Sequence, residues 1–264
     1  MTEAATDLKP TKKAPEPEEE ESGKMTFLEH LDDLRKCLVH IAAYVGIGFI
    51  ACWYWSKQIY HFISIPILNA LPSGTRLVYT KVTDIFILYM KVAFIAGIFL
   101  TIPLTLYEVW KFIAPALYRK EKRYVLPFLF FSVFLFLLGG AFCYTVVLEQ
   151  AFSFLVQFGA DFSPMITANE YMDMTLMMLV GFGVIFEMPV ISAFLSMFGL
   201  VTAHFLWSRF KYSLVIIVIL AAVLSPTADA FNLLIWTMPM VGLYVVSIGV
   251  AWIFGHKRKA KGLV

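Results

Sequence analysis

The chain alternates between long apolar runs and short polar connections, a pattern typical of a protein that crosses a membrane several times. The apolar runs cover residues 38–55, 85–106, 125–147, 174–198, 212–224 and 233–254. A membrane-spanning helix needs about 20 apolar residues, and about 17 is the lower end of the common range. The fifth run falls below that length, so hydropathy alone does not decide whether it crosses.

The charges of the connections decide the number of crossings. Basic residues precede the first run, separate the second from the third and the fourth from the fifth, and follow the sixth: Arg35, Lys36, Lys111, Arg119, Lys120, Lys122, Arg123, Arg209, Lys211, Lys257, Arg258, Lys259 and Lys261. The connections after the third and fifth runs carry only acidic charges, and the first connection is mixed. Because Lys and Arg resist translocation, the pattern predicts six crossings with both termini in the cytoplasm.

The segment before the first run predicts a helix that lies on the membrane surface. Thr26 and Glu29 have the spacing of a capping box, and apolar residues then follow at helical intervals into the first span. Residues 1–24 are acidic and rich in Pro, which predicts a disordered tail. We therefore predict an acidic tail at 1–24, a six-helix transmembrane domain at 25–255 and a basic cytoplasmic tail at 256–264.

Composition agrees with a membrane protein and excludes several function classes. The chain is 60% hydrophobic and 15% charged, whereas a soluble domain has about a quarter charged residues. Its three cysteines, Cys37, Cys52 and Cys143, lie in or beside apolar runs and do not have metal-ligand spacing. The sequence contains no P-loop and no hydrolase or metalloprotease motif. We expect no enzyme activity, no cofactor, no metal and no nucleic-acid partner.

A glutamate lies within the fourth apolar run. Glu187 is followed by Pro189, which removes a backbone donor and frees a carbonyl. A carboxylate at membrane depth is costly, so it indicates a functional site, here a polar contact with a partner helix. Two alternatives remain at this stage: a structural residue that bonds a neighbouring helix, or the coupling acid of a secondary transporter. Against a transporter, the sequence has no visible internal repeat.

Three further charged positions have two interpretations each. Lys91 either extends to the outer interface or pairs with Glu187 or another carboxylate. Asp32 has Lys36 four residues later as a partner, so Asp33 is the less neutralised acid of the N-terminal helix. Asp33 therefore lies on either a solvated face or a binding site. Glu121, the lone acid in a basic loop, marks either a binding site or a plain topology signal.

Four sequence segments together resemble the TatC family, the core subunit of the twin-arginine protein translocase. They are His30-Leu31-Asp32-Asp33-Leu34-Arg35-Lys36, Phe112-Ile113-Ala114-Pro115-Ala116-Leu117-Tyr118 with Glu121, Gly183-Val184-Ile185-Phe186-Glu187-Met188-Pro189-Val190, and Ser225-Pro226-Thr227-Ala228-Asp229-Ala230-Phe231. The resemblance extends over about residues 26–254. It implies an all-α polytopic membrane protein with six transmembrane helices, the fifth and sixth short, and a cytoplasmic N-terminal amphipathic helix.

The resemblance also implies a function and a set of site residues. Family members bind the twin-arginine signal peptides of folded proteins, for export driven by the proton-motive force. The positions that match signal-peptide binding are Asp33, Glu121, Phe112, Leu117 and Arg35. Asp33 departs from the usual glutamate and is one methylene shorter. Two forked guanidinium groups are well recognised by carboxylates, which agrees with the two acids.

The remaining family positions lie within and outside the membrane. Glu187 matches the family's transmembrane glutamate, Pro66 its first outer-loop proline and Asp229 its last outer-loop acid. The implied location is the inner membrane, in a receptor complex that contains more than one copy of the chain. The implied partners are TatA-like and TatB-like single-span subunits, which dock against the lipid-facing sides of the fifth and sixth helices and near Glu187.

Overall fold

The first helix, α1 (Phe27–Tyr54), joins the predicted surface helix to the first span without a break over 28 residues. The computed structural model describes residues 27–72, 75, 77–113, 125–159, 161–162, 165–224 and 229–259. The capping threonine, the acidic tail and the last residues of the basic tail lie outside these ranges. Within them, the one contact between extended segments is a bridge between Val78 and Thr167, and the other elements are helical.

The remaining helices follow the six-run pattern of the sequence. They are α2 (Ser56–Ile63), α3 (Ile65–Ala70), α4 (Val82–Ile113), α5 (Val125–Phe142), α6 (Leu148–Phe158), α7 (Ala168–Ile185), α8 (Met188–Met197), α9 (Ala203–Ser208), α10 (Phe210–Leu224) and α11 (Ala230–Lys259). A π-helical turn, Cys143–Val147, joins α5 to α6. Among the described residues, five helical segments are long and apolar enough to span a membrane.

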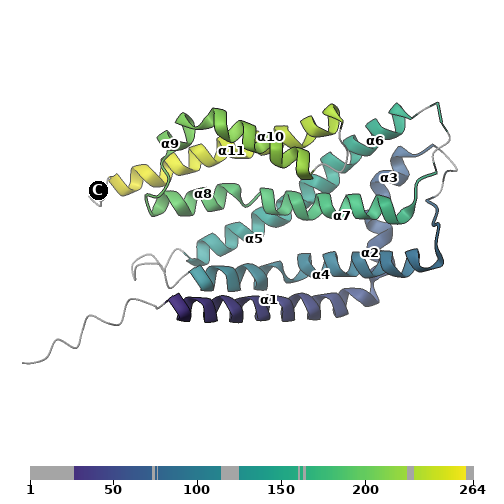
Figure 1. Ribbon diagram of the computed structural model, residues 1–264, viewed down its shortest axis with the longest axis horizontal. Helices are drawn as coiled ribbons and strands as arrows, with labels where there is room; N and C mark the ends of the chain where they lie inside the picture. Colours follow the sequence, from purple (N-terminus) through teal and green to yellow (C-terminus); the bar gives the residue numbers. More distant parts are fainter. Residues whose placement is uncertain are drawn as a thin grey trace, which may run out of the picture.

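The predicted six-span architecture is confirmed, with one correction. The spans are α1, α4, α5 with α6, α7 with α8, the short α10, and α11. The sixth span is not short, because α11 has 30 residues, whereas α10 has 15. Figure 1 shows the spans side by side, in the order α1, α4, α5, α7 with α8, then α10 with α11. Helix α1 begins on the same side as α11 ends, hereafter the terminal side.

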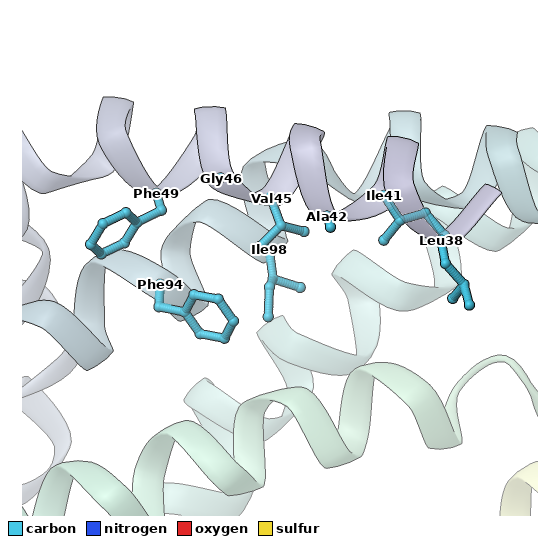
Figure 2. A pocket seen from close by; sticks show the side chains of 8 residues that line it. All are labelled: Leu38, Ile41, Ala42, Val45, Gly46, Phe49, Phe94 and Ile98. Atoms are coloured by element: carbon cyan, nitrogen blue, oxygen red, sulfur yellow. The ribbon is translucent and has the colours of Figure 1, made fainter. Parts of the chain in front are cut away.

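Helices α1 and α4 approach each other at two glycines. A Cβ atom on Gly48 would lie 2.7 Å from the carbonyl oxygen of Gly97, and one on Gly97 would lie 2.6 Å from the backbone nitrogen of Phe49. Such close backbone approach is characteristic of helix packing in membranes, where van der Waals contact rather than water exclusion drives association. On one side of this contact, the two helices form an apolar groove (Figure 2).

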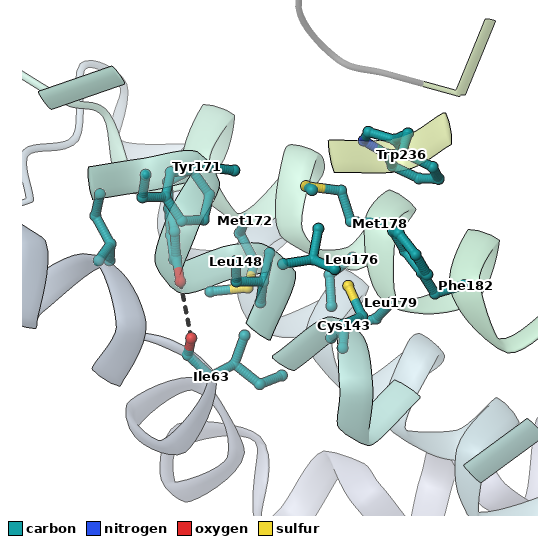
Figure 3. Packing of buried hydrophobic residues seen from close by; sticks show 14 of the residues in the cluster. Ile63, Cys143, Leu148, Tyr171, Met172, Leu176, Met178, Leu179, Phe182 and Trp236 are labelled. Carbon is teal, nitrogen blue, oxygen red and sulfur yellow. Dashed lines mark hydrogen bonds between the residues drawn. The ribbon is translucent and has the colours of Figure 1, made fainter. Parts of the chain in front are cut away.

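The main core lies between α7, its neighbours and α11. The side chains of Phe182 and Trp236 are fully buried, with ring centroids 4.5 Å apart. On the side opposite the termini, the Tyr171 hydroxyl donates a hydrogen bond of 2.8 Å to the backbone carbonyl of Ile63 at the end of α2 (Figure 3). The long helices are thus fixed to one another through α7, while α1 packs mainly on α4 at the edge.

Candidate functional site

The beginning of α1 brings one predicted acid next to the end of α4. The His30 ring stacks on Phe112, with centroids 4.4 Å apart. Asp33 follows His30 by three residues, so the two share one side of the helix. Phe112 is the penultimate residue of α4, and the basic loop follows it. Glu121 and Leu117 belong to that loop and lie outside the described residues, so their placement stays a prediction.

The two aspartates of α1 differ in their contact with Lys36. The Lys36 ammonium lies 2.7 Å from Asp32 but 3.8 Å from Asp33. Asp32 is therefore the neutralised acid, as its four-residue spacing from Lys36 predicts. Arg35 is exposed and points to a different face, because two residues turn an α-helix by about 200°. The contact of His30 with Phe112 therefore places the side of α1 that carries Asp33 toward the end of α4, whereas Arg35 lies on a different side of the helix.

A third acid on the terminal side, Glu108, was missed by the sequence analysis. It is only 5% exposed, and three groups surround its carboxylate. The Tyr44 hydroxyl donates to Oε1 at 3.3 Å, the Lys111 ammonium lies 3.4 Å from Oε2, and His40 Nδ1 lies 3.5 Å from Oε1. Two of these groups come from α1, so Glu108 links α1 to α4 just before the predicted signal-peptide loop.

One signal in the sequence could have revealed Glu108. Lys111 stands three residues after it, the spacing of a helical ion pair. The predicted second run ended at Leu106, so Glu108 was expected to lie outside the membrane, where a charged residue is common. In the structure α4 continues to Ile113, so Glu108 still packs against α1.

Glu187 occupies a break in the fourth span. Helix α7 ends at Ile185 and α8 begins at Met188, with Pro189 in its first turn. Glu187 is half-buried, and its Oε1 atom is buried without a hydrogen-bond partner among the described residues. The helix break therefore coincides with the two residues, Glu187 and Pro189, that interrupt the fourth apolar run.

A short polar path leads from Glu187 toward the terminal side. Ser132 of α5 lies close enough to interact with the Glu187 carboxyl group. The Trp110 indole N–H donates a hydrogen bond of 3.2 Å to the Ser132 hydroxyl, and both side chains are buried. Trp110 is two residues from Phe112. The path thus connects the broken helix, α5 and the end of α4, and neither Trp110 nor Ser132 was predicted from the sequence.

The two predicted outer-loop residues, Pro66 and Asp229, lie at the starts of helices on the opposite side. Pro66 is buried in the first turn of α3. The Asp229 carboxylate accepts hydrogen bonds from the backbone N–H of Asn232 at 2.8 Å and from its side-chain amide at 2.9 Å. Asp229 thus satisfies a free donor at the start of α11. Pro66 thus lies at the start of one helix, and the contacts of Asp229 stabilise the start of another.

Lys91 adopts one of its two predicted roles. Its ammonium lies 2.6 Å from Asp173 and 3.3 Å from the Asn169 side-chain oxygen, both on α7. The partner is therefore another carboxylate and not Glu187. The pair is partly exposed, as expected near the membrane boundary. Within the described ranges, no three His, Cys, Asp or Glu side chains gather in a way that could hold a metal ion.

Comparison with known proteins matches nearly the whole chain. The family model of the Sec-independent protein translocase protein (TatC) matches residues 29–239. The TatC protein of Koribacter versatilis is 45% identical over 90% of this chain and 89% of its own length, and that of Desulforapulum autotrophicum is 35% identical over 90% and 88%. A crystal structure of the twin-arginine translocase receptor TatC, 31% identical, superposes with a TM-score of 0.77 and covers 86% of this chain and 99% of that one. The chain is therefore a multi-pass membrane protein that belongs to the TatC family of protein translocase subunits.

Proposed function

We propose that this translocase subunit is the receptor for twin-arginine signal peptides of folded proteins, and that Asp33 and Glu121 bind the paired arginines. The observation that supports this most is the stack between His30 and Phe112. It holds the surface part of α1 against the end of α4, where the loop with Glu121 begins. The described chain ends only eight residues before Glu121, so this loop can reach Asp33 over a short distance.

The chemistry of these groups suits the ligand. Each carboxylate accepts two parallel hydrogen bonds from a guanidinium group, which a lysine ammonium cannot reproduce. The Phe112 ring and Leu117 would flank the arginines and reduce their contact with water. Arg35 lies on another face of α1, so we assign it no direct contact with the arginines.

The surrounding charges support an orientation and an energy source. The terminal side carries the basic connections, so we propose that it faces the cytoplasm and that the protein resides in the inner membrane with both termini inside. The sequence has no nucleotide-binding loop. We therefore propose that the proton-motive force, acting through the assembled translocase, supplies the energy for export.

Two features support docking of single-span TatA-like and TatB-like subunits. The side chains of α10 that remain exposed are largely apolar, among them Val215, Ile219 and Val223. Glu187 has a buried oxygen without a donor among the described residues, which a polar group of a partner helix could supply. We propose that these subunits contact α10, α11 and the surroundings of Glu187, in a complex with more than one copy of this chain.

Peptide affinity tests the receptor proposal. The wild-type chain, purified in detergent, should bind an Arg-Arg signal peptide much more tightly than its Lys-Lys version. If Phe112 and Leu117 shelter the arginines as proposed, Glu121→Gln should weaken Arg-Arg binding by about 2–5 kcal/mol, because a sheltered charge pair loses one member. Asp33→Asn should weaken it less, and Asp32→Asn, which removes the acid already paired with Lys36, is the matched control. Equal affinity of the wild type for both peptides would contradict the proposal.

A further inference from the structure

The side of α1 that packs on α4 continues to Asp33. Four residues share that side, because they follow one another at intervals of four, three and four positions: Tyr44, His40, Cys37 and Asp33. Tyr44 and His40 both reach Glu108 of α4, and Cys37 is buried. Asp33 therefore lies where the packed side of α1 ends, and its position depends on how α1 lies against α4.

Glu108 holds α1 through two contacts on one oxygen. The Tyr44 hydroxyl lies 3.3 Å from Oε1 and His40 Nδ1 lies 3.5 Å from it, one helical turn apart on α1. Sliding of α1 along α4 in either direction would lengthen one of these two contacts. The Lys111 ammonium, on α4 itself, lies 3.4 Å from Oε2 and fixes the carboxylate. Glu108 is 5% exposed, which leaves little room for water to replace these partners.

The stack between His30 and Phe112 constrains Asp33 less. Stacked rings accept a range of offsets, whereas hydrogen bonds weaken steeply as their distance and angle change. His40 is seven residues, or about 10 Å of helix axis, from Asp33. The contacts of Glu108 are therefore close enough to Asp33, and directional enough, to set its position along α4.

The position of a carboxylate matters more for binding an arginine than for binding a lysine. A guanidinium group donates two parallel hydrogen bonds, so both carboxylate oxygens must be aligned with it. A lysine ammonium is a compact charge with rotatable donors, and it tolerates other alignments. Binding groups need to be held within about 0.5 Å of their productive positions. A shift of α1 should therefore weaken binding of an Arg-Arg peptide and change binding of a Lys-Lys peptide little.

We propose that Glu108 is a positioning residue that sets the preference of the receptor for Arg-Arg over Lys-Lys peptides. It acts through Tyr44 and His40, which hold the side of α1 that carries Asp33, and it does not touch the peptide. This inference rests on the proposed function of Asp33. A residue with only a structural role would behave differently, because partial unfolding lowers the amount of active receptor equally for both peptides and leaves the ratio of their affinities unchanged.

The ratio of the two peptide affinities, measured on the full chain in detergent, tests this role. Glu108→Ala should weaken Arg-Arg binding about tenfold, the effect of about one hydrogen bond to a charged group, and so lower the ratio about tenfold. Glu108→Gln keeps an acceptor for the Tyr44 hydroxyl, so its ratio should lie between those of Glu108→Ala and the wild type. Tyr44→Phe removes only one hydroxyl group and should lower the ratio about threefold.

Tyr171→Phe is the matched control for Tyr44→Phe. It also removes one hydroxyl group, whose hydrogen bond to the Ile63 carbonyl lies on the side opposite the termini. Its melting temperature should fall while its affinity ratio stays that of the wild type. A wild-type ratio in both Glu108→Ala and Tyr44→Phe would overturn the positioning role and leave the receptor proposal intact. So would an equal loss of preference in Tyr171→Phe, whereas a wild type without any preference would overturn both proposals.

Discussion

Two carboxylates of the bundle, Glu108 and Glu187, differ in the polar partners that the fold gives them. Glu108 is 5% exposed and has Tyr44, His40 and Lys111 around it. Glu187 lies at a break between two helices, and its Oε1 atom has no partner among the described residues. A buried acceptor without a donor costs about 1–3 kcal/mol. We therefore expect Glu108 to stabilise the fold and Glu187 to contribute little to the free energy of unfolding.

Glu108 links two helices of the fold, whereas Glu187 has an oxygen that a partner subunit could bind. The partners of Glu108 come from α1 and α4, so their interaction fixes the edge helix that carries Asp33. Ser132 lies near the Glu187 carboxyl group, but Oε1 has no hydrogen-bond partner among the described residues. A helix from another subunit could satisfy it at no cost to contacts within the chain. The following predictions are ordered from the largest expected effect to the smallest.

The contact that brings Glu108 against α1 should be the most sensitive to substitution. Gly97→Leu places a side chain 2.6 Å from the backbone nitrogen of Phe49, which cannot rotate away. The two helices must separate, and we expect a loss of about 3 kcal/mol in the free energy of unfolding. Unfolding of the purified protein in detergent measures this, with Gly249→Leu as a control in open space. Wild-type stability of Gly97→Leu would show that the two helices do not approach this closely.

Glu108→Ala should cost about 2 kcal/mol in the free energy of unfolding, because hydrogen bonds to a charged group are lost. The cost is limited since His40 and Lys111 are about half exposed and regain water. The same unfolding measurement applies. Glu108→Gln keeps the size of the side chain, so its free energy of unfolding should lie between those of Glu108→Ala and the wild type. A stabilised Glu108→Ala would refute its role as a link between α1 and α4.

Glu187→Ala should change the free energy of unfolding by less than about 1 kcal/mol, because the relief of an unpaired buried oxygen offsets the lost packing. Instead, the substitution should reduce the amount of single-span subunit that co-purifies with the chain. Ser192→Ala in α8, whose hydroxyl bonds the Ser247 carbonyl within the chain, is a control for the same region. If Glu187→Ala failed to accumulate in the membrane, a structural role would be favoured. Full co-purification would remove the partner role.

The ion pair between Lys91 and Asp173 should contribute least. The two charged groups lie 2.6 Å apart but are about a third and a half exposed. Exposed pairs stabilise a fold by about 0.2–1 kcal/mol, and salt screens them. Lys91→Gln should therefore lower the melting temperature slightly at low salt and not at high salt. A large loss that persists in high salt would mean that Lys91 has a further role.

The sequence predicted the spans well because their signals are local. Run length and loop charge sufficed to place the six crossings. The prediction of a short sixth span was wrong because it came from the family resemblance and not from the apolar run. Its apolar run alone, 233–254, already had the length of a full crossing.

The contacts of the site were harder to predict because they join residues far apart in the chain. Glu108 is 64 residues from Tyr44, and Lys91 is 82 residues from Asp173. Each pair depends on how far one helix is shifted along the other, which the close approach at Gly48 and Gly97 sets for α1 and α4. A single sequence does not reveal that register, so it suggested Asp33 and Glu187 as candidate site residues but did not reveal the contacts of Glu108.

Site-specific cross-linking from Phe112 tests the central claim most directly. A photoreactive residue at this position, in the full chain in its membrane, should capture a precursor with an Arg-Arg signal peptide and not its Lys-Lys version. The same residue at Tyr79, an exposed position on the opposite side of the bundle, should capture neither. Equal capture of both precursors from Phe112, or capture that Glu121→Gln leaves unchanged, would contradict the account.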